Sequence, residues 1–75
     1  MKRLTQDDFN DVPTWVNSLT VNANGELWGH EVRVRYLDCN DRRFWCALMD
    51  RVSILIDTGY DVIRWRESAI DRANK

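Results

Sequence analysis

The sequence has few of the residues from which catalytic and metal centres are built. Its 75 residues include one histidine, two cysteines, three glycines and one proline. One histidine and two separated cysteines cannot supply the four ligands of a zinc site, and three glycines do not make a glycine-rich phosphate loop. Long apolar runs are also missing, so neither a transmembrane helix nor a secretory signal is expected. We therefore expect a protein that is not an enzyme and binds no metal or cofactor.

Neither sign of charge is in excess. Lys and Arg together number 11, Asp and Glu number 12, and the net charge is -1 at pH 7. This balance excludes a strongly basic nucleic-acid coat and an acidic mimic of DNA. Hydrophobic residues make up 44% of the chain and charged residues 31%, as in globular proteins. A chain this short forms one domain, and we expect that domain to span 1–75.

The clearest local signal is a β-hairpin. Asn24-Gly25 is the preferred two-residue turn, because both turn positions need a positive φ angle. Alternating apolar residues on either side predict strands at 15–23 and 26–36. Such a turn sets the register, which gives these facing pairs on the apolar side: Val21 with Trp28, Leu19 with His30, Asn17 with Val32 and Trp15 with Val34. We expect His30 to be a packed, hydrogen-bonded residue rather than a catalytic base.

The segment after the hairpin predicts a long amphipathic helix at 40–58. Asp38 is suited to cap its start, and Gly59 is suited to end it in a left-handed conformation. At helical spacing one stripe is formed by Phe44, Trp45, Leu48, Met49, Val52, Leu55 and Ile56. A rival interpretation makes 43–49 a strand, because apolar and polar residues also alternate there.

The two cysteines lie at the start of this segment. If the helix forms, Cys39 and Cys46 are two turns apart, or about 10 Å along the axis. A disulfide needs Cα atoms within about 7 Å. We therefore expect two reduced thiols, as is usual for a protein of the cytoplasm.

Both ends of the chain carry weaker signals. The pattern Thr5-x-x-Asp8 predicts a short helix at 6–11, with Leu4, Phe9 and Val12 turned inward. Residues 60–66 read as a closing strand. After it, Ser68 is suited to cap a final short helix, and we expect 72–75 to fray.

These elements predict an α+β fold. A three-stranded sheet, made of the hairpin and the C-terminal strand, packs on the one long helix, with the short helix at the N-terminus. The third strand is placed beside the first strand, or alternatively beside the second as a right-handed crossover unit. The expected core consists of Trp15, Leu19, Val21, Trp28, Val32, Val34, Phe44, Leu48, Val52, Leu55, Ile56, Ile63 and Trp65.

Arginine supplies the best indication of a binding surface. In the predicted sheet Arg33 and Arg35 point away from the helix, as do Arg64 and Arg66, and all four should gather at one end of the open face together with Tyr60. A planar guanidinium group can bind a carboxylate or phosphate through two parallel N–H···O hydrogen bonds. The alternative is a solvated face on which the arginine stems cover apolar sheet.

The expected partner is a protein rather than a nucleic acid. Single-stranded nucleic acids bind to aromatic platforms, whereas the tryptophans are expected on the helix side of the sheet. A nucleic-acid-binding accessory protein that uses the same arginines is the second hypothesis, and a structural or self-associating protein is the third. No membrane association is expected, and the protein is expected to be a monomer or a small homo-oligomer.

Two resemblances bear on the source of the partner. The first is to short reading frames of tailed bacteriophages, and it is carried by Leu4-Thr5, Phe9, Pro13, Trp15-Val16, Val21-Asn22, Gly25-Glu26 and Trp28. The second is between the order hairpin, helix, strand, ending in 59–66, and the small podovirus inhibitor of bacterial RNA polymerase. In that family an Arg-x-Arg pair on the closing strand binds the polymerase, so the resemblance implies that Arg64 and Arg66 contact the partner.

The resemblances imply a small accessory protein of a phage that binds and inhibits a bacterial protein. The target would be RNA polymerase or a defence protein, met in the cytoplasm of the host.

Overall fold

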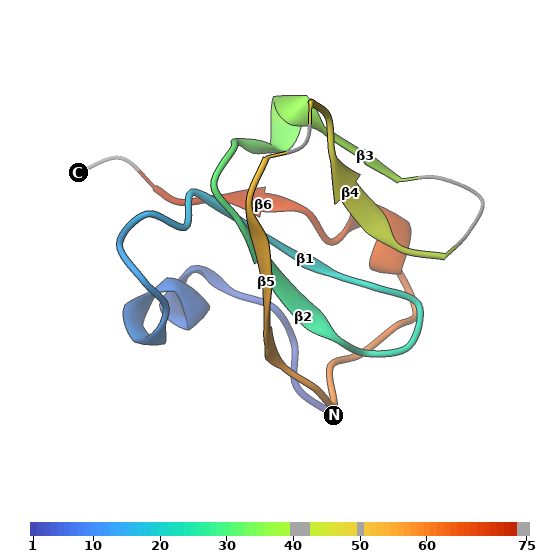
Figure 1. Cartoon of the computed structure of the whole chain (residues 1–75). Helices are drawn as coiled ribbons and strands as arrows, with labels where there is room; N and C mark the ends of the chain where they lie inside the picture. Colours follow the sequence, from blue (N-terminus) through green and yellow to red (C-terminus); the bar gives the residue numbers. More distant parts are fainter. Residues whose placement is uncertain (40–42, 50, 74–75) are drawn as a thin grey trace.

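The computed structural model describes residues 1–39, 43–49 and 51–73, and in this part of the chain it contains six strands and three single 3-10 turns (Figure 1). The elements in chain order are η1 (Gln6–Asp11), β1 (Ser18–Val21), β2 (Leu27–His30), η2 (Val34–Tyr36), β3 (Leu37–Cys39), β4 (Trp45–Ala47), β5 (Ser53–Asp57), η3 (Trp65–Glu67) and β6 (Ile70–Asp71). Four strands form an antiparallel sheet in the order β5-β2-β1-β6, and β3 with β4 forms a separate hairpin.

The predicted α+β architecture is wrong, because the long helix at 40–58 is absent. Two strands, β4 and β5, lie in that segment, whereas 40–42 and 50 lie outside the described residues. The physical reason is the placing of isoleucine at alternate positions of β5. Ile54 and Ile56 pack against the core while Leu55 between them is exposed, and β-branched residues favour this two-residue period. β4 lies within 43–49, the segment for which the rival interpretation predicts a strand.

The hairpin forms, but its predicted register is wrong by one residue. Val21 lies opposite Leu27, and Thr20 lies opposite Trp28. The N–H of Gly25 donates to the carbonyl oxygen of Asn22 at 3.0 Å, and Gly25 alone of the turn residues has a positive φ angle (85°). The loop is therefore a three-residue type with a glycine bulge. A shift of one residue moves Trp28 and His30 to the opposite face relative to β1.

One face of the four-stranded sheet carries the hydrophobic core. Leu19, Val21 and Leu27 are fully buried there, and η1 with the segment that follows it covers them. The remaining members are Phe9, Val16 and Tyr60, with Leu4, Val12, Ile54, Ile56 and Ile70 packed around them. Gly29 lies under this layer, where a Cβ atom would come within 2.7 Å of Ile56 and 2.9 Å of Val16. This face therefore needs glycine at position 29.

The predicted core is confirmed only in part. Leu19 and Val21 are buried as expected. The members of the predicted core that are instead exposed are Trp15, Phe44, Leu48, Val52, Leu55 and Ile63. Most of these residues belong to the predicted helix. Because that helix is absent, they do not cover the apolar face of the sheet.

The other face of the sheet is polar and is covered by the β3–β4 hairpin. Ser18, Thr20 and Asn22 point to this side from β1, and His30 does so from β2. The N–H of Trp45 donates to Asn22 Oδ1 at 2.7 Å, which attaches β4 to the sheet. Figure 1 shows η1 (blue) at the lower left and the β3–β4 hairpin at the upper right. The two layers thus lie on opposite sides of the sheet.

The N-terminal prediction is confirmed and the C-terminal one is wrong. Residues 6–11 form a helical turn of 3-10 type, in which Asp8 accepts a hydrogen bond from the N–H of Thr5 at 2.8 Å and Phe9 is buried. The predicted strand at 60–66 is replaced by η3 and an isolated bridge between Lys2 and Tyr60. Ser68 ends η3 instead of starting a helix.

The cysteines lie on the two strands of the small hairpin rather than on one helix. Asp38 lies opposite Cys46, and Cys39 lies opposite Trp45, so the two thiols point to opposite faces. Neither forms a disulfide. The expectation of two reduced thiols is confirmed, but for a different geometric reason. No described helix is long and apolar enough to cross a membrane.

Candidate functional site

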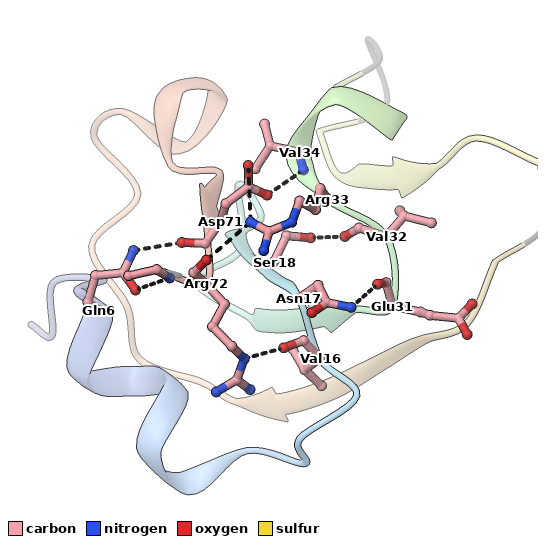
Figure 2. A network of polar contacts seen from close by, with 11 residues as sticks. Gln6, Val16, Asn17, Ser18, Glu31, Val32, Arg33, Val34, Asp71 and Arg72 are labelled. Carbon is pink, nitrogen blue, oxygen red and sulfur yellow. Dashed lines mark hydrogen bonds and ion pairs between the residues drawn. The ribbon is translucent and has the colours of Figure 1, made fainter. Parts of the chain in front are cut away.

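Arg33 is part of the structure that fixes the C-terminus (Figure 2). Its Nη1 donates to the carbonyl oxygen of Arg72 at 3.1 Å and lies 3.9 Å from the carboxylate of Asp71. The other oxygen of Asp71 accepts a hydrogen bond from the N–H of Val34 at 2.7 Å. The side chain is therefore directed towards β6.

A second arginine, which sequence reasoning missed, completes this attachment. Arg72 donates through Nε to the carbonyl oxygen of Val16 at 2.8 Å and through Nη2 to that of Pro13 at 3.2 Å, while its guanidinium lies over the ring of Phe9. Gln6 donates to the carbonyl oxygen of Asp71 and accepts from the N–H of Ala73. The expected fraying of 72–75 is thus wrong for 72 and 73, and 74–75 lie outside the described residues.

Tyr60 is placed in the core and not on an open face. Its exposed fraction is 5%, and its hydroxyl donates to Asp8 Oδ1 at 2.8 Å. Burial, and then the neighbouring Asp8 carboxylate, raise the pKa of Tyr60 above its ordinary value. The residue therefore holds the segment after β5 against η1.

The remaining predicted arginines do not gather in one patch. Arg64 precedes η3 and Arg66 lies within it, and Ser68 ties η3 to the Val21 end of β1. Arg35 lies in η2, near the Ser18 end of β1, with its guanidinium 4.8 Å from the Tyr36 ring centroid. Those ends of β1 are about 10 Å apart at the usual rise per residue. The predicted closing strand would have joined the two pairs, and that strand is absent.

A different candidate surface is formed by exposed apolar residues of 35–52, a segment that we call the hairpin arm. These residues are Tyr36, Phe44, Leu48, Met49 and Val52. The N–H of Leu48 donates to the carbonyl oxygen of Tyr36 at 2.8 Å, so the two ends of the arm lie side by side. Met49 follows at once, with 78% of its surface exposed. The arm also carries Arg35, Arg43 and Arg51.

Beneath the arm lies a cleft of about 770 Å³. We call it the aromatic cleft, and its lining includes Trp28, Phe44, Trp45, Arg43, Arg51, Glu26 and Ser53. Both indole N–H groups are used within the protein, by Glu26 Oε1 at 3.2 Å for Trp28 and by the carbonyl oxygen of Trp65 at 2.9 Å for Trp45. Trp28, expected on the helix side of the sheet, and Trp45, expected in the apolar stripe of the helix, therefore line an open space.

The helical interpretation concealed this cleft, because it put Arg43 on the solvated side of the helix and Phe44 in the core. The sequence signal that points to the cleft is the alternation of isoleucine in β5, because alternation favours a strand over the predicted helix.

His30 is buried beside Ser53, a residue that lines the cleft, and lies between two hydroxyl groups. Its Nδ1 is 2.7 Å from Ser53 Oγ and its Nε2 is 2.8 Å from Thr20 Oγ1. Burial lowers the pKa of His30 to about 4. A serine beside a histidine suggests a nucleophile, but such a weak base, oriented by a hydroxyl group instead of a carboxylate, is poorly suited to activate it. The expectation of a packed, hydrogen-bonded histidine is confirmed.

A second groove, of about 620 Å³, lies beside η3 and mixes both signs of charge. Arg3 and Arg64 line it together with Asp61 and Glu67. Arg64 lies 3.9 Å from Glu67, and both side chains are largely exposed. Exposed pairs of this kind contribute little to stability or specificity.

The aromatic cleft with the hairpin arm is therefore the stronger candidate site. The described residues include no group of three or more possible metal ligands. Comparison of the chain with known protein families, with characterised proteins and with solved structures finds no match.

Proposed function

We propose that this chain is a small non-enzymatic accessory protein that acts by binding to, and blocking, a larger protein. The observation that carries the proposal is the hairpin arm, on which Tyr36, Leu48 and Met49 are exposed next to one another. Soluble proteins rarely expose large contiguous apolar patches unless the patch binds something.

The composition of the arm supports a protein as the partner. Residues 35–52 contain one tyrosine, one phenylalanine, one methionine and four arginines, and no lysine or glutamate, together with three aspartates. Protein interfaces are enriched in tyrosine, phenylalanine, methionine and arginine and depleted in lysine, glutamate and aspartate. Arginine and large aromatic residues also dominate binding energies at interfaces. A partner surface that is apolar with acidic groups at its border would fit this arm.

The resemblance to tailed-phage reading frames supports a bacterial protein in the host cytoplasm as the partner. RNA polymerase is not favoured over a defence protein, because the resemblance to the polymerase inhibitors rests on the order hairpin, helix, strand, and the helix and closing strand are absent. The contact residues proposed here are those of the arm, with Arg35 among them. Arg64 and Arg66 stay a separate prediction, on another part of the surface.

A second function is favoured by one specific observation. Trp28, Phe44 and Trp45 line a cleft that Arg43 and Arg51 also line, and single-stranded nucleic acids bind to aromatic faces bordered by cations. Binding of this kind weakens steeply as salt is raised. A salt-dependent affinity for single-stranded DNA or RNA would support it.

Affinity purification from a bacterial lysate tests the protein-binding proposal. Met49 and Ile63 are matched in exposure, at 78% and 79%, but only Met49 lies on the arm. We expect the unchanged chain and the Ile63→Asp variant to recover one protein in stoichiometric amount, and the Met49→Asp variant to lose it. Recovery by Met49→Asp, or the absence of any stoichiometric partner, would contradict the proposal.

A further inference from the structure

We propose that the aromatic cleft binds an extended, acidic segment of the partner protein, which inserts one large apolar or aromatic side chain between the rings. This inference rests on the proposed function and adds the chemistry of the bound segment. Four features of the site support it: the hydrogen-bonded indole N–H groups, the arginines at the cleft, the two glutamates near them and the edge of β5.

The rings of the cleft offer apolar surface without hydrogen-bond donors. The indole N–H groups of Trp28 and Trp45 are both bonded within the protein, and Phe44 has no polar group. Leu55 lies directly opposite Trp28 on the neighbouring strand and is exposed, which extends the apolar floor towards the edge of the sheet. An apolar or aromatic side chain fits against these rings, because no indole N–H is left unpaired when it enters.

The charges at the cleft favour carboxylate groups beside that side chain. Arg43 is exposed two residues before β4. Arg51 lies 3.8 Å from Glu31, with both side chains about half exposed, and so weak a pair is readily replaced. Guanidinium groups bind carboxylates through two parallel hydrogen bonds. An acidic segment therefore complements this site.

Two acidic groups make a peptide a better occupant than a nucleic acid. Glu26 lines the cleft, and Glu31 lies beside Arg51. A nucleic acid carries a charge at every nucleotide and would place phosphates near these carboxylates, whereas a peptide can have neutral residues at those positions. The net charge of -1 also provides no general attraction for a polyanion.

The edge of β5 provides a place for the main chain of the segment. β5 is the outermost strand of the sheet, next to β2. The N–H of Glu31 donates to the carbonyl oxygen of Val52, so the alternation of antiparallel pairing directs the N–H and C=O of Ser53 and Leu55 outward. Ser53 also lines the cleft. A strand added at this edge would run along the mouth of the cleft and could place alternate side chains in it.

The edge is short, which limits the length of the segment. A register shift at Trp28 and the ion pair between Lys2 and Asp57 interrupt it at the far end. Bulges and charges at an edge restrict pairing with other strands. The proposed segment therefore pairs over only a few residues, and its specificity comes from the cleft.

Selection of peptides on the intact protein tests the inference. A yeast-displayed library of random dodecapeptides is selected on the immobilised full chain, and the affinity of an enriched synthetic peptide is measured by tryptophan fluorescence. We expect a consensus with one large apolar or aromatic residue and two or more acidic residues close to it. Enriched sequences without acidic residues, or no consensus at all, would overturn the inference.

Variants locate the binding. The double variant Arg43→Glu, Arg51→Glu should lower the affinity by about tenfold or more, whereas Arg64→Glu, a charge reversal outside the aromatic cleft, should leave it unchanged. An equal loss in both variants would contradict binding at the cleft. Leu55→Pro should weaken binding more than Leu55→Ala does, because only proline removes the outward N–H. Far-UV circular dichroism shows whether each variant is folded.

Two further outcomes separate this inference from the proposed function. If a stoichiometric partner is recovered from lysate and binds the Arg43→Glu, Arg51→Glu variant equally well, the protein binds a partner but the cleft assignment is wrong. If a thymidine dodecanucleotide binds the cleft and no peptide does, the cleft is a nucleic-acid site and the inference is overturned.

Discussion

Arg72 Nε donates to the carbonyl oxygen of Val16 at 2.8 Å, which joins two residues 56 positions apart in the sequence. Val16 is fully buried, so its carbonyl oxygen has no access to water. The same guanidinium lies over the ring of Phe9 and also reaches Pro13. This one side chain therefore ties the C-terminal strand to the entry of β1 and to the turn that covers the core.

Arg72→Ala should lower the free energy of unfolding by about 2 kcal/mol, because it leaves a buried acceptor unpaired and removes the contact with Phe9. The measurement is urea denaturation followed by circular dichroism. Arg66→Ala is the control, since Arg66 is exposed and lies over the Trp65 ring. Equal and small effects of both substitutions would show that the attachment is unimportant.

His30 should make stability depend on pH. Its pKa is about 4 in the folded protein and 6.5 ordinarily, because burial disfavours the charged ring. The unfolded chain therefore takes up a proton below about pH 6.5 that the folded protein takes up only near pH 4. The stabilisation is complete above pH 6.5 and is lost as pH falls, by about 3 kcal/mol in total at pH 4.

Thermal unfolding between pH 7.5 and 4 checks this linkage, with His30→Gln as the control because glutamine does not titrate. The difference in unfolding free energy between the two proteins should shrink steadily as pH falls through this range. A difference that is constant with pH would show that the folded protein does not depress the pKa of His30.

Gly29→Ala should destabilise the protein by about 1–3 kcal/mol, the usual cost of overfilling a packed core. The added Cβ atom would lie 2.7 Å from Ile56 Cδ1 and 2.9 Å from Val16 Cγ1. Adding Ile56→Val removes the nearer of the two contacts, so the double variant should recover part of the loss relative to Ile56→Val alone. If the losses in unfolding free energy of the two single variants simply add in the double variant, the close packing over Gly29 is not the cause of the destabilisation.

Gly25→Ala should cost about 1–2 kcal/mol, since φ is 85° at this position. Asn24→Ala should cost less, because Asn24 has no positive φ angle and loses only its side-chain bond to the N–H of Glu26. In the two-residue turn expected from the sequence, both positions would need a positive φ angle. A nuclear Overhauser effect between the Hα atoms of Val21 and Leu27 would confirm the register independently, and one between Asn22 and Leu27 would contradict it.

The sequence predicts the local features of this fold better than its long-range ones. The Asn24-Gly25 turn and the short helix that buries Phe9 depend on neighbouring residues, and both are present. The register is wrong because the same two residues fit a three-residue loop with glycine alone in the left-handed conformation. The residues that the Arg72 side chain bonds lie at least 56 positions away, and no local pattern indicates them.

The largest error concerns the segment that forms the site. Between Phe44 and Ile56 the apolar residues follow a helical period, and within 43–49 they also alternate. The helical period covers more residues, so the sequence favours a helix. Only the tertiary packing of Ile54 and Ile56 on the core decides between them. That choice determines whether Phe44 is buried or lines a cleft. The predicted grouping of the arginines depended on a strand at 60–66, and that strand is absent.

The most direct test is hydrogen–deuterium exchange of the protein, alone and in complex with the partner recovered from lysate. We expect slower exchange of backbone amides at Leu48 and Met49 on the arm and at Ser53 and Leu55 beside the cleft, with Arg64 to Glu67 unchanged. Slower exchange at Arg64 to Glu67 with an unchanged arm and cleft would contradict this expectation.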